Sequence, residues 1–332
     1  MDRHIVTTAA LHVSYVCTHR CPMCYANSSK SDESNAKHPP VNMVKNVISE
    51  LVKNGVNNIS FVGGDPAIYP FILDVSEYAY SLGCTLSILS NTLSFSKAMS
   101  NIVKFIDCFE GTIHDCTARK HDEFCQREGA YDLLVSNLKY FSDLGKKIGI
   151  TINITPFTYD KIYDIVNAII LKGINVHHLV LQRIIPFGRA EKNHSYELTL
   201  QQLETALNQV ELAEKSFNLQ VIFEDPFPLC AIKPKFYRYM HPCEWGITKV
   251  SVDYKGNLSR CGADPRCSLG NIFEIGSLSN LWENSNELLE FRKKDYLETK
   301  CHNCNMLDRC GGACPISRHP ELGFTQDYIS NL

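Results

Sequence analysis

Three cysteines within eight residues constrain this chain more than any other stretch. Cys17, Cys21 and Cys24 are separated by three and then two residues, and they follow a short apolar run over residues 11–16. Thiolates are the usual ligands of iron–sulfur clusters, and a cubane with four irons needs four ligands. A loop that supplies three thiolates therefore leaves one iron open to a substrate or a cofactor.

A zinc site or a disulfide pair would also use cysteines in this stretch. Structural zinc ordinarily takes four nitrogen or sulfur ligands, often as two paired hooks, whereas this loop supplies three thiols. The spacing therefore favours an iron–sulfur cluster over both alternatives.

Length and composition are ordinary for a soluble globular protein. The 332 residues suffice for one large α/β domain or two smaller ones. A net charge of −3 argues against a general nucleic-acid binder, and no apolar run approaches the roughly 18 residues of a membrane span. Fifteen cysteines without a secretory signal favour metal binding over disulfides. We therefore expect a cytoplasmic protein with no nucleic-acid or membrane partner.

Strand-like and helix-like segments alternate through the first half of the chain. Apolar residues at helical spacing predict helices over 41–54, 71–81, 131–144 and 159–171. The apolar segments between them predict strands over 11–16, 58–62, 85–89, 105–113, 148–154 and 176–185. Such alternation implies a parallel sheet with right-handed crossovers.

A second informative stretch, Gly63-Gly64-Asp65-Pro66, ends the second predicted strand. Two glycines let the backbone approach a ligand without a Cβ in the way. The carboxyl end of a strand is also where α/β folds bind ligands. Turns are rich in these residues, so the motif gains weight only from its place one β/α unit after the cysteines.

Together these motifs resemble the radical S-adenosylmethionine (SAM) superfamily. Residues 63–66 are similar to its Gly-Gly-Glu-Pro motif, which holds the SAM ammonium group, and Asp65 is one methylene shorter than the usual Glu. Tyr25 fits the aromatic residue that often follows the third cysteine. The resemblance implies a partial (β/α)6 TIM-like barrel and a 4Fe–4S cluster whose open iron binds SAM. In this family SAM is cleaved to a 5′-deoxyadenosyl radical, which abstracts hydrogen from the substrate.

Polar residues near the ends of the predicted strands are further candidates for binding SAM. They could contact its ribose, carboxylate or adenine, although each alone could equally cap a loop. These residues are Ser90, Asn91, Thr112, Asn153 and Gln182.

The C-terminal part of the chain is rich in cysteine, with seven of the fifteen beyond residue 240. Twelve residues separate Cys243 from Gly256, and four more separate Gly256 from Cys261. Cys301-x2-Cys304-x5-Cys310-x3-Cys314 follows one predicted helix over 278–294. This pattern resembles the SPASM domain, which holds two auxiliary 4Fe–4S clusters, and residues 186–190 resemble the segment that precedes it.

The resemblance assigns the tail cysteines to two clusters. The first would take Cys243, Cys261 and Cys314 with an upstream cysteine, for which Cys230 is the candidate. The second would take Cys301, Cys304 and Cys310. In peptide epimerases of the family a free thiol returns hydrogen to the substrate, so Cys230 could instead be a catalytic hydrogen donor.

The tail departs from the family because no cysteine lies within residues 315–332. The second cluster would then be held by three thiolates, or completed by Asp327, His319 or the C-terminal carboxylate. Cys267 could replace Cys230 or serve the second cluster. A zinc ribbon remains an alternative for the last four cysteines, because four thiolates also suit zinc.

Four other cysteines match no cluster motif and are expected to be small buried apolar residues. They are Cys84, Cys108, Cys116 and Cys125, of which the last two lie in a polar stretch that we interpret as a loop. His114, Asp115 and His121 in the same stretch either face a substrate cavity or cap the loop.

The expected organisation is a radical SAM barrel over 1–190, a connecting helix and linker over 191–229, and a SPASM-like domain over 230–332. Members with such a tail mostly modify ribosomally made peptides or proteins, by thioether or carbon–carbon cross-links or by epimerisation. Anaerobic sulfatase-maturase-like oxidation and tetrapyrrole side-chain modification are alternatives. A non-enzymatic iron–sulfur electron carrier or scaffold is a third.

The resemblance also implies partners. The reductant would be of the flavodoxin or ferredoxin type, and the setting anaerobic, because such clusters are oxygen-labile. The first predicted strand lies close to the start of the chain, so we expect a separate protein or the barrel rim to bind any leader of a peptide substrate.

Overall fold

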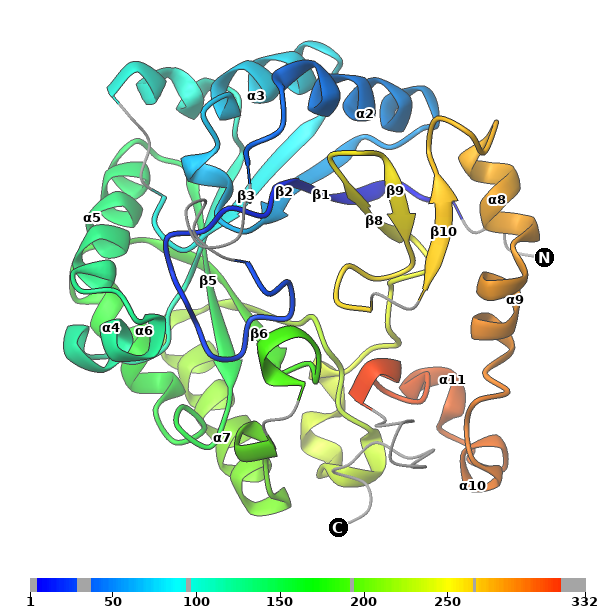
Figure 1. Cartoon of the computed structure of the whole chain (residues 1–332). Helices are drawn as coiled ribbons and strands as arrows, with labels where there is room; N and C mark the ends of the chain where they lie inside the picture. The colour runs from blue at the N-terminus through cyan, green and yellow to red at the C-terminus, as the bar shows by residue number, and fades with distance from the viewer. Residues whose placement is uncertain (1–4, 29–36, 94–96, 192–193, 265–266, 318–332) are drawn as a thin grey trace.

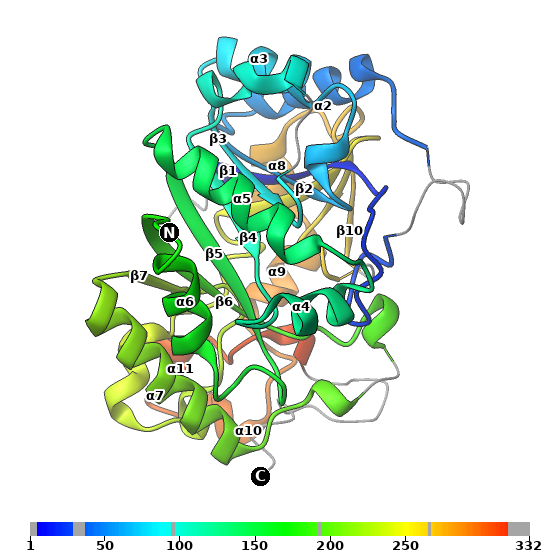
Figure 2. The ribbon, with the colours of Figure 1, turned by 90° about the vertical axis from the view of Figure 1, so that its left-hand side faces the viewer.

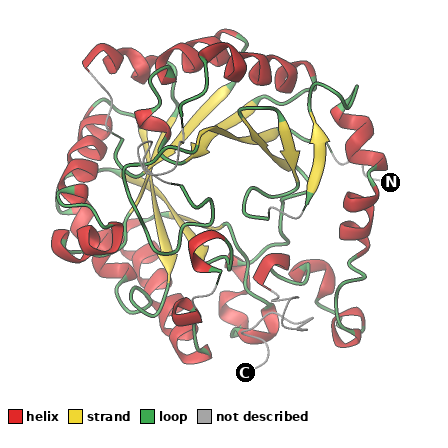
Figure 3. Cartoon of the chain, in the orientation of Figure 1, coloured by secondary structure: helices red, strands yellow, loops and turns green. Residues whose placement is uncertain are grey.

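The computed structural model describes residues 5–28, 37–93, 97–191, 194–264 and 267–317. A ten-stranded sheet in the order β10-β9-β8-β1-β2-β3-β4-β5-β6-β7 curves around a central space (Figure 1). Helices lie on its outer side (Figure 3). β8 and β1 to β7 run parallel to one another, whereas β9 is antiparallel to both β8 and β10.

The strands are short and follow the predicted order. They are β1 Thr8–Ser14, β2 Asn58–Gly63, β3 Thr85–Ser90, β4 Cys108–Thr112, β5 Lys147–Ile154, β6 Val176–Arg183, β7 Gln220–Phe223, β8 Lys249–Asp253, β9 Asn257–Ser259 and β10 Ser268–Asn271.

The longer helices bury an apolar face. In α2, for example, Val44, Val47, Ile48 and Leu51 are buried at helical spacing. The α-helices are α2 Val41–Lys53, α3 Ile72–Ser81, α4 Ala118–Cys125, α5 Ala130–Asp143, α6 Ile162–Ile170, α7 Leu200–Phe217, α8 Leu278–Asn284, α9 Asn286–Lys293, α10 Thr299–His302 and α11 Leu307–Cys310. Among the described residues, no helix combines the length and the apolar character that crossing a membrane requires.

The predicted fold class is confirmed, and the barrel is larger than the six units that the sequence predicts. β7 extends the sheet beyond β6, and β8 extends it beyond β1. Glu224, just after β7, forms an ion pair with Lys249 of β8 at 3.4 Å. This pair links the two ends of the row of eight parallel strands, so that they surround one interior.

Two local predictions are wrong. The polar stretch interpreted as a loop contains α4, whose buried residues are His121 and Cys125. Periodicity missed it because its inward positions carry no aliphatic residue. The apolar pattern over 278–294 predicted one helix, but the chain leaves helical geometry at Ser285, which separates α8 from α9.

The C-terminal helices are anchored to the barrel through Trp282 of α8. Its side chain is fully buried, and its indole Nε1 donates to the carbonyl of Ile247 at 2.7 Å, just before β8. Arg292 of α9 donates from Nε to the carbonyl of Gly246 at 3.2 Å. These contacts fix the start of β8 against the C-terminal region.

We predict that Trp282→Ala lowers the free energy of unfolding by about 3–5 kcal/mol, as expected for removing a buried aromatic side chain. Trp282→Phe should cost less, because it keeps most of the apolar contact and loses only the indole hydrogen bond. Urea unfolding followed by far-UV circular dichroism measures both. Equal stability of Trp282→Ala and the unsubstituted protein would contradict this anchor.

Candidate active site

The three N-terminal cysteines lie on the loop that follows β1, here called the cysteine loop (residues 17–24). Cys17 and Cys21 are buried, and Cys24 is partly exposed. The turn after β2 holds the start of this loop. The amide of Gly64 donates to the carbonyl of Ser14 at 2.8 Å, and the amide of Asp65 donates to that of Val16 at 2.9 Å.

Only glycine permits this close approach. A Cβ on Gly63 would lie 2.1 Å from the Ser14 carbonyl oxygen, and one on Gly64 would lie 2.1 Å from that of Val16. Gly63 also has a φ of +127°, which side chains disfavour. The two glycines therefore bring the ends of β1 and β2 together at the carboxyl edge of the sheet.

The carboxylate of Asp65 is fully buried and used within the protein. It accepts hydrogen bonds from the Ser90 hydroxyl at 2.5 Å, the Thr92 hydroxyl at 2.7 Å and the Ala67 amide at 3.2 Å. Asp65 and Ser90 thus hold the turn after β2 against the end of β3, where Pro66 begins a short 3-10 turn.

A segment distant in sequence fastens the other end of the cysteine loop. Arg189 donates from Nε to the carbonyl of Cys21 at 2.7 Å, and its amide donates to the carbonyl of Cys24 at 3.0 Å. A Cβ on Gly188 would lie 2.4 Å from the carbonyl oxygens of Cys24 and Tyr25. Residues 188–189, which follow β6, therefore form part of the site.

Cys17 is the most enclosed end of the loop. Its sulfur accepts from the His19 amide at 3.4 Å and lies 3.9 Å from Nδ2 of Asn91. Burial, reinforced by the charge of Asp65, raises the pKa of Cys17 to about 12. A bound metal must therefore displace the proton from this thiol. Asn91, predicted to contact SAM, lies beside a cysteine of the loop.

The middle cysteine of the loop has neighbours that sequence reasoning missed. A ring nitrogen of His19 and the sulfurs of Cys21 and Cys125 all lie within 4.8 Å of one another. Hydrogen bonds from Cys125 and, more weakly, His114 hold the pKa of Cys21 well below its ordinary value. A thiolate is the form that binds iron, so these neighbours favour the ligand form of Cys21.

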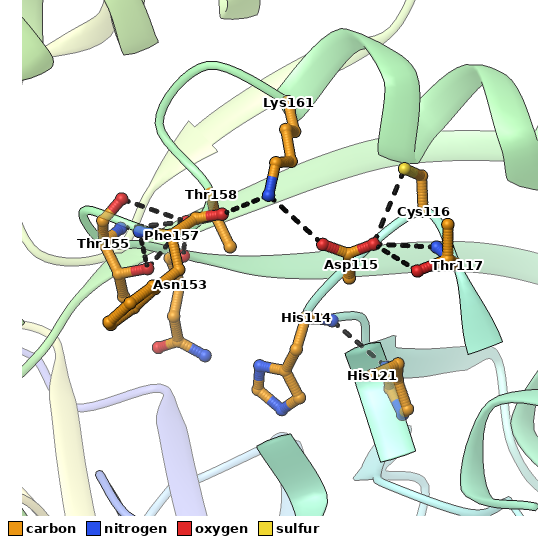
Figure 4. Close-up of polar contacts among 10 residues, drawn as sticks. All are labelled: His114, Asp115, Cys116, Thr117, His121, Asn153, Thr155, Phe157, Thr158 and Lys161. Atoms are coloured by element: carbon orange, nitrogen blue, oxygen red, sulfur yellow. Dashed lines mark hydrogen bonds and ion pairs between the residues drawn. The ribbon is translucent and has the colours of Figure 1, made fainter. Parts of the chain in front are cut away.

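Two polar side chains around α4 bond to the loop itself (Figure 4). Asp115 accepts from the amide and hydroxyl of Thr117 and forms an ion pair with Lys161 at 3.4 Å. Nδ1 of His121 accepts from the His114 amide at 3.2 Å, and burial lowers the pKa of His121 to about 3. Of the two alternatives left open by the sequence, Asp115 and His121 hold the loop.

The interior of the barrel contains a cavity of about 310 Å³, here called the barrel cavity. Met23 and Tyr25 line it beside the cysteine loop, and Trp245 and Cys261 line it from the C-terminal region. Of the predicted SAM contacts, Tyr25, Asn153 and Gln182 line this cavity, whereas Thr112 is buried at the end of β4.

Several charged groups face the barrel cavity. Glu110 forms an ion pair with His178 at 3.4 Å, and Gly149 makes room for it, because a Cβ there would lie 2.3 Å from the imidazole. Asp225 follows β7, and its carboxylate accepts from the Arg183 amide at 3.2 Å. Burial, with the charge of Glu224, raises the pKa of Asp225 to about 7 although Arg183 opposes the shift.

The tail cysteines lie in two groups. Cys261 and Cys314 are buried in one small apolar cluster with Ile185 and Ile316. Burial and, after it, the nearness of the Cys314 sulfur raise the pKa of Cys243, so these three form the first cysteine group. Cys301 of α10, Cys304 and Cys310 of α11 form the second cysteine group. His319 and Asp327 lie outside the described residues.

The positions of Cys230 and Cys267 separate them from the barrel cavity. Cys230 is exposed and lines a surface groove with Gln201 and Phe236. This placement argues against the predicted role of Cys230 as a hydrogen donor. Cys267 is partly exposed.

The cysteine loop fits an iron–sulfur cluster with one open iron. Three thiols lie beside the Gly63-Gly64 turn, here called the glycine cradle. A Cβ on either glycine would collide with the backbone of Ser14 or Val16. The pKa of one of these thiols, Cys21, is already depressed. Cys17, Cys21 and Cys24 would hold the cluster. The fold and the site define an enzyme that binds SAM at an iron–sulfur cluster.

Comparisons with known families agree. The sequence matches the radical SAM superfamily over residues 11–169 and an iron–sulfur cluster-binding domain, SPASM, over residues 243–305. The chain belongs to the radical SAM superfamily and carries a SPASM domain. Its cofactors are therefore SAM and 4Fe–4S clusters.

Relatives at low identity cover most of the chain. The PqqA peptide cyclase of Rhizobium meliloti is 24% identical over 311 residues, covering 90% of this chain and 80% of that protein. The AdoMet-dependent heme synthase of Oleidesulfovibrio alaskensis is 23% identical over 292 residues, covering 81% and 72%. The structure of Streptococcus suis SuiB bound to S-adenosylmethionine has a TM-score of 0.77 at 19% identity, covering 99% of this chain and 78% of that one. This last likeness shows the shared fold.

We predict that Gly64→Ala lowers iron loading at the cysteine loop and formation of 5′-deoxyadenosine at least tenfold. The added Cβ collides with the backbone of Val16, which cannot move without displacing Cys17. Gly55→Ala is the matched control, because Gly55 also has a positive φ but no atom within 4 Å of its Cβ position. Normal iron loading in Gly64→Ala would contradict the proposed cradle.

We predict that Arg189→Ala weakens the cluster on the cysteine loop more than it weakens the fold. A hydrogen bond from a charged group to a carbonyl contributes about 1.5–3 kcal/mol, and here it acts on the Cys21 carbonyl. Anaerobic iron analysis and electron paramagnetic resonance (EPR) should show a broadened or depleted signal from this cluster, while auxiliary iron is retained. Arg189→Lys should recover little, because an ammonium cannot reproduce the guanidinium contacts. The exposed Arg119→Ala is the control, and identical spectra for Arg189→Ala and Arg119→Ala would contradict the proposed role.

Proposed function

We propose that this enzyme abstracts hydrogen from a ribosomally made peptide or protein and converts it to a thioether, a carbon–carbon cross-link or an epimer. One observation carries the proposal: the barrel cavity reaches both the cysteine loop, through Met23 and Tyr25, and the first cysteine group, through Cys261. A side chain placed in this cavity would lie between the SAM site and an auxiliary cluster.

The lining of the cavity suits a segment of polypeptide. Its walls combine apolar side chains, such as Ile185 and Trp245, with hydrogen-bonding groups such as Asn153 and Gln182. A few convergent polar groups in a mainly apolar cavity are typical of sites that orient a ligand. Comparisons support this substrate class, since SuiB has also been solved bound to its precursor peptide SuiA and the PqqA relative is a peptide cyclase.

When bound, the cluster and SAM supply the one-electron cleavage that yields a 5′-deoxyadenosyl radical. The protein's own residues position the cysteine loop, orient bound groups, exclude water and accept a proton. The glycine cradle and Arg189 fix the cysteine loop beside the cavity, which Met23 of this loop lines. Asn153 and Gln182 orient groups in the cavity, and the buried core beneath it excludes water. Asp225 titrates near neutral pH, so its carboxylate can accept the proton that an oxidative cross-link releases.

A tetrapyrrole substrate is the second candidate, because the heme synthase relative covers most of this chain. The two candidates differ in the compound that stimulates SAM cleavage. A peptide can place one or a few of its side chains in the cavity. A tetrapyrrole must place its whole rigid, planar ring system there.

We predict that reconstituted enzyme with SAM and dithionite converts a precursor peptide encoded beside its gene and forms more 5′-deoxyadenosine than without peptide. Mass spectrometry should show the loss of two hydrogen atoms for each cross-link. For epimerisation, the peptide should keep its mass in H2O and gain deuterium in D2O. Removing the leader from the peptide should lower the yield. Cys17→Ala is the inactive control.

A porphyrin tested in parallel decides between the candidates. Stimulation of SAM cleavage by porphyrin, together with none by peptide, would contradict the peptide proposal and favour tetrapyrrole modification.

A further inference from the structure

The barrel cavity exists because three neighbouring strands carry small residues on their inward side. Thr8 and Ala10 of β1, Ser60 of β2 and Ser87 of β3 all line it. The hydroxyls of Ser60 and Ser87 lie 2.7 Å apart and bond to each other. In closed barrels of parallel strands, bulky branched side chains usually fill such inward positions. The hollow is therefore a property of this sequence, and it leaves room for part of a ligand.

The wall formed by β4, β5 and β6 carries a carboxylate and an imidazole that face this hollow. Glu110 of β4 and His178 of β6 line the cavity, and 18% and 16% of their side chains are exposed. Between them, a Cβ on Gly149 of β5 would lie 2.3 Å from Nε2 of His178 and 3.0 Å from Cγ of Glu110. Figure 2 shows this wall from the side, with α5 and α6 outside it. Glycine in β5 thus lets the two side chains meet across the strand.

Glu110 and His178 lie deeper in the barrel than the predicted SAM contacts. His178 precedes Gln182 by four residues in β6, and Gly149 precedes Asn153 by four residues in β5. At about 3.3 Å per residue along a strand, this separation is about 13 Å. A group that binds Glu110 therefore extends into the barrel from the edge where SAM is predicted to bind.

The partners of Glu110 leave its charge available to a cation. One carboxylate oxygen accepts from the Thr151 hydroxyl, and the other lies 3.4 Å from Nε2 of His178. A neutral imidazole can donate a hydrogen bond to a carboxylate, but it does not cancel the charge.

The lysine and arginine side chains that line the cavity are engaged with other partners. Lys249 forms ion pairs with Glu244 at 2.9 Å and with Glu224 at 3.4 Å. Arg183 donates from Nη1 to the carbonyl of Pro226 at 3.2 Å. A cation that enters the cavity from outside is therefore the group that best completes the surroundings of Glu110.

A second polar group shows that the cavity suits a ligand. His12 of β1 lines it with 3% of its surface exposed, and its Nε2 lies 3.1 Å from the Ser251 hydroxyl. Its other ring nitrogen, Nδ1, has no hydrogen-bond partner among the described residues. Buried polar atoms are rarely left without a partner, because the loss of their hydrogen bonds to water is costly. A polar group of a ligand in the cavity would supply this hydrogen bond.

We propose that Glu110 binds the positively charged head of a lysine or arginine side chain of the peptide substrate. The inference rests on the proposed function, and it narrows the substrate class to peptides with a basic residue in the segment that enters the barrel cavity. The small residues of β1 to β3 give this side chain room, and Glu110 accepts charge-assisted hydrogen bonds from its head. SAM also carries cationic sulfonium and ammonium groups, so the experiment distinguishes the two sources of positive charge.

The test uses the cluster-loaded enzyme, SAM and the precursor peptide encoded beside its gene. Each lysine or arginine of the modified segment is replaced in turn by norleucine, which keeps an unbranched apolar chain and removes the charge. At one position this change should lower kcat/KM by about tenfold or more, as expected when one partner of a charged pair is lost. Glu110→Gln should lower kcat/KM for the natural peptide by a similar factor. The norleucine peptide should lose no more with this variant, because both changes remove the same contact.

Two controls accompany the variant. Glu123→Gln removes an exposed carboxylate that pairs with Arg119 on α4, and it should behave as the unsubstituted enzyme does. Without peptide, Glu110→Gln should bind SAM with unchanged affinity in isothermal titration calorimetry, which also shows that the variant folds. Weaker binding of SAM by Glu110→Gln, with no response to norleucine in the peptide, would assign Glu110 to SAM and overturn the inference.

The substitutions in the peptide need no enzyme variant, so they decide the matter even if Glu110→Gln fails to fold. The inference is overturned, while the proposed function stands, if the unsubstituted enzyme converts the natural peptide and every norleucine peptide equally well. It is likewise overturned if the modified segment contains no lysine or arginine. Conversion of no peptide at all would contradict the proposed function itself, and this inference with it.

Discussion

The site depends on two backbone hydrogen bonds between the ends of β1 and β2. The amides of Gly64 and Asp65 donate to the carbonyls of Ser14 and Val16, across a gap that no side chain could share. This contact sets where the cysteine loop leaves the barrel. Asp65, bonded to Ser90 and Thr92, then ties the same turn to the end of β3. Three consecutive strand ends are thereby fixed relative to one another at the edge where parallel sheets bind ligands.

The rest of the site is added by segments that are remote in sequence. Arg189 fastens the far end of the cysteine loop after β6, and the carbonyl of Cys125 at the end of α4 accepts from the Arg20 amide at 3.0 Å. The C-terminal region supplies the opposite wall through Trp245 and Cys261. The barrel cavity is thus enclosed by two cysteine-bearing regions. This arrangement supports the proposal that a substrate lies between two clusters.

The local elements could be predicted from the sequence, because apolar spacing reports directly on burial. The predicted helix over 131–144 corresponds to α5, Ala130–Asp143, and the strand over 148–154 to β5, Lys147–Ile154. α4 escaped prediction because His121 and Cys125, not aliphatic residues, face inward. The pairing of β8 with β1 also could not be predicted, since it joins strands more than 230 residues apart.

Part of the candidate site could likewise be predicted from the sequence, and part could not. The cysteine loop and the double glycine follow from spacing alone, because both motifs act through contiguous residues. The internal use of Asp65 and Ser90, the contacts of Arg189 and the neighbours of Cys230 depend on tertiary packing.

We propose that the cysteine loop holds the cluster at which SAM is cleaved. The tail holds its iron independently of this loop. Anaerobic reconstitution with iron and sulfide, followed by dithionite and SAM, tests it directly through the yield of 5′-deoxyadenosine. The unsubstituted enzyme should form 5′-deoxyadenosine, and the variant without Cys17, Cys21 and Cys24 should form none while retaining its auxiliary iron. An enzyme that binds iron but never cleaves SAM, or a variant that still cleaves it, would contradict the account.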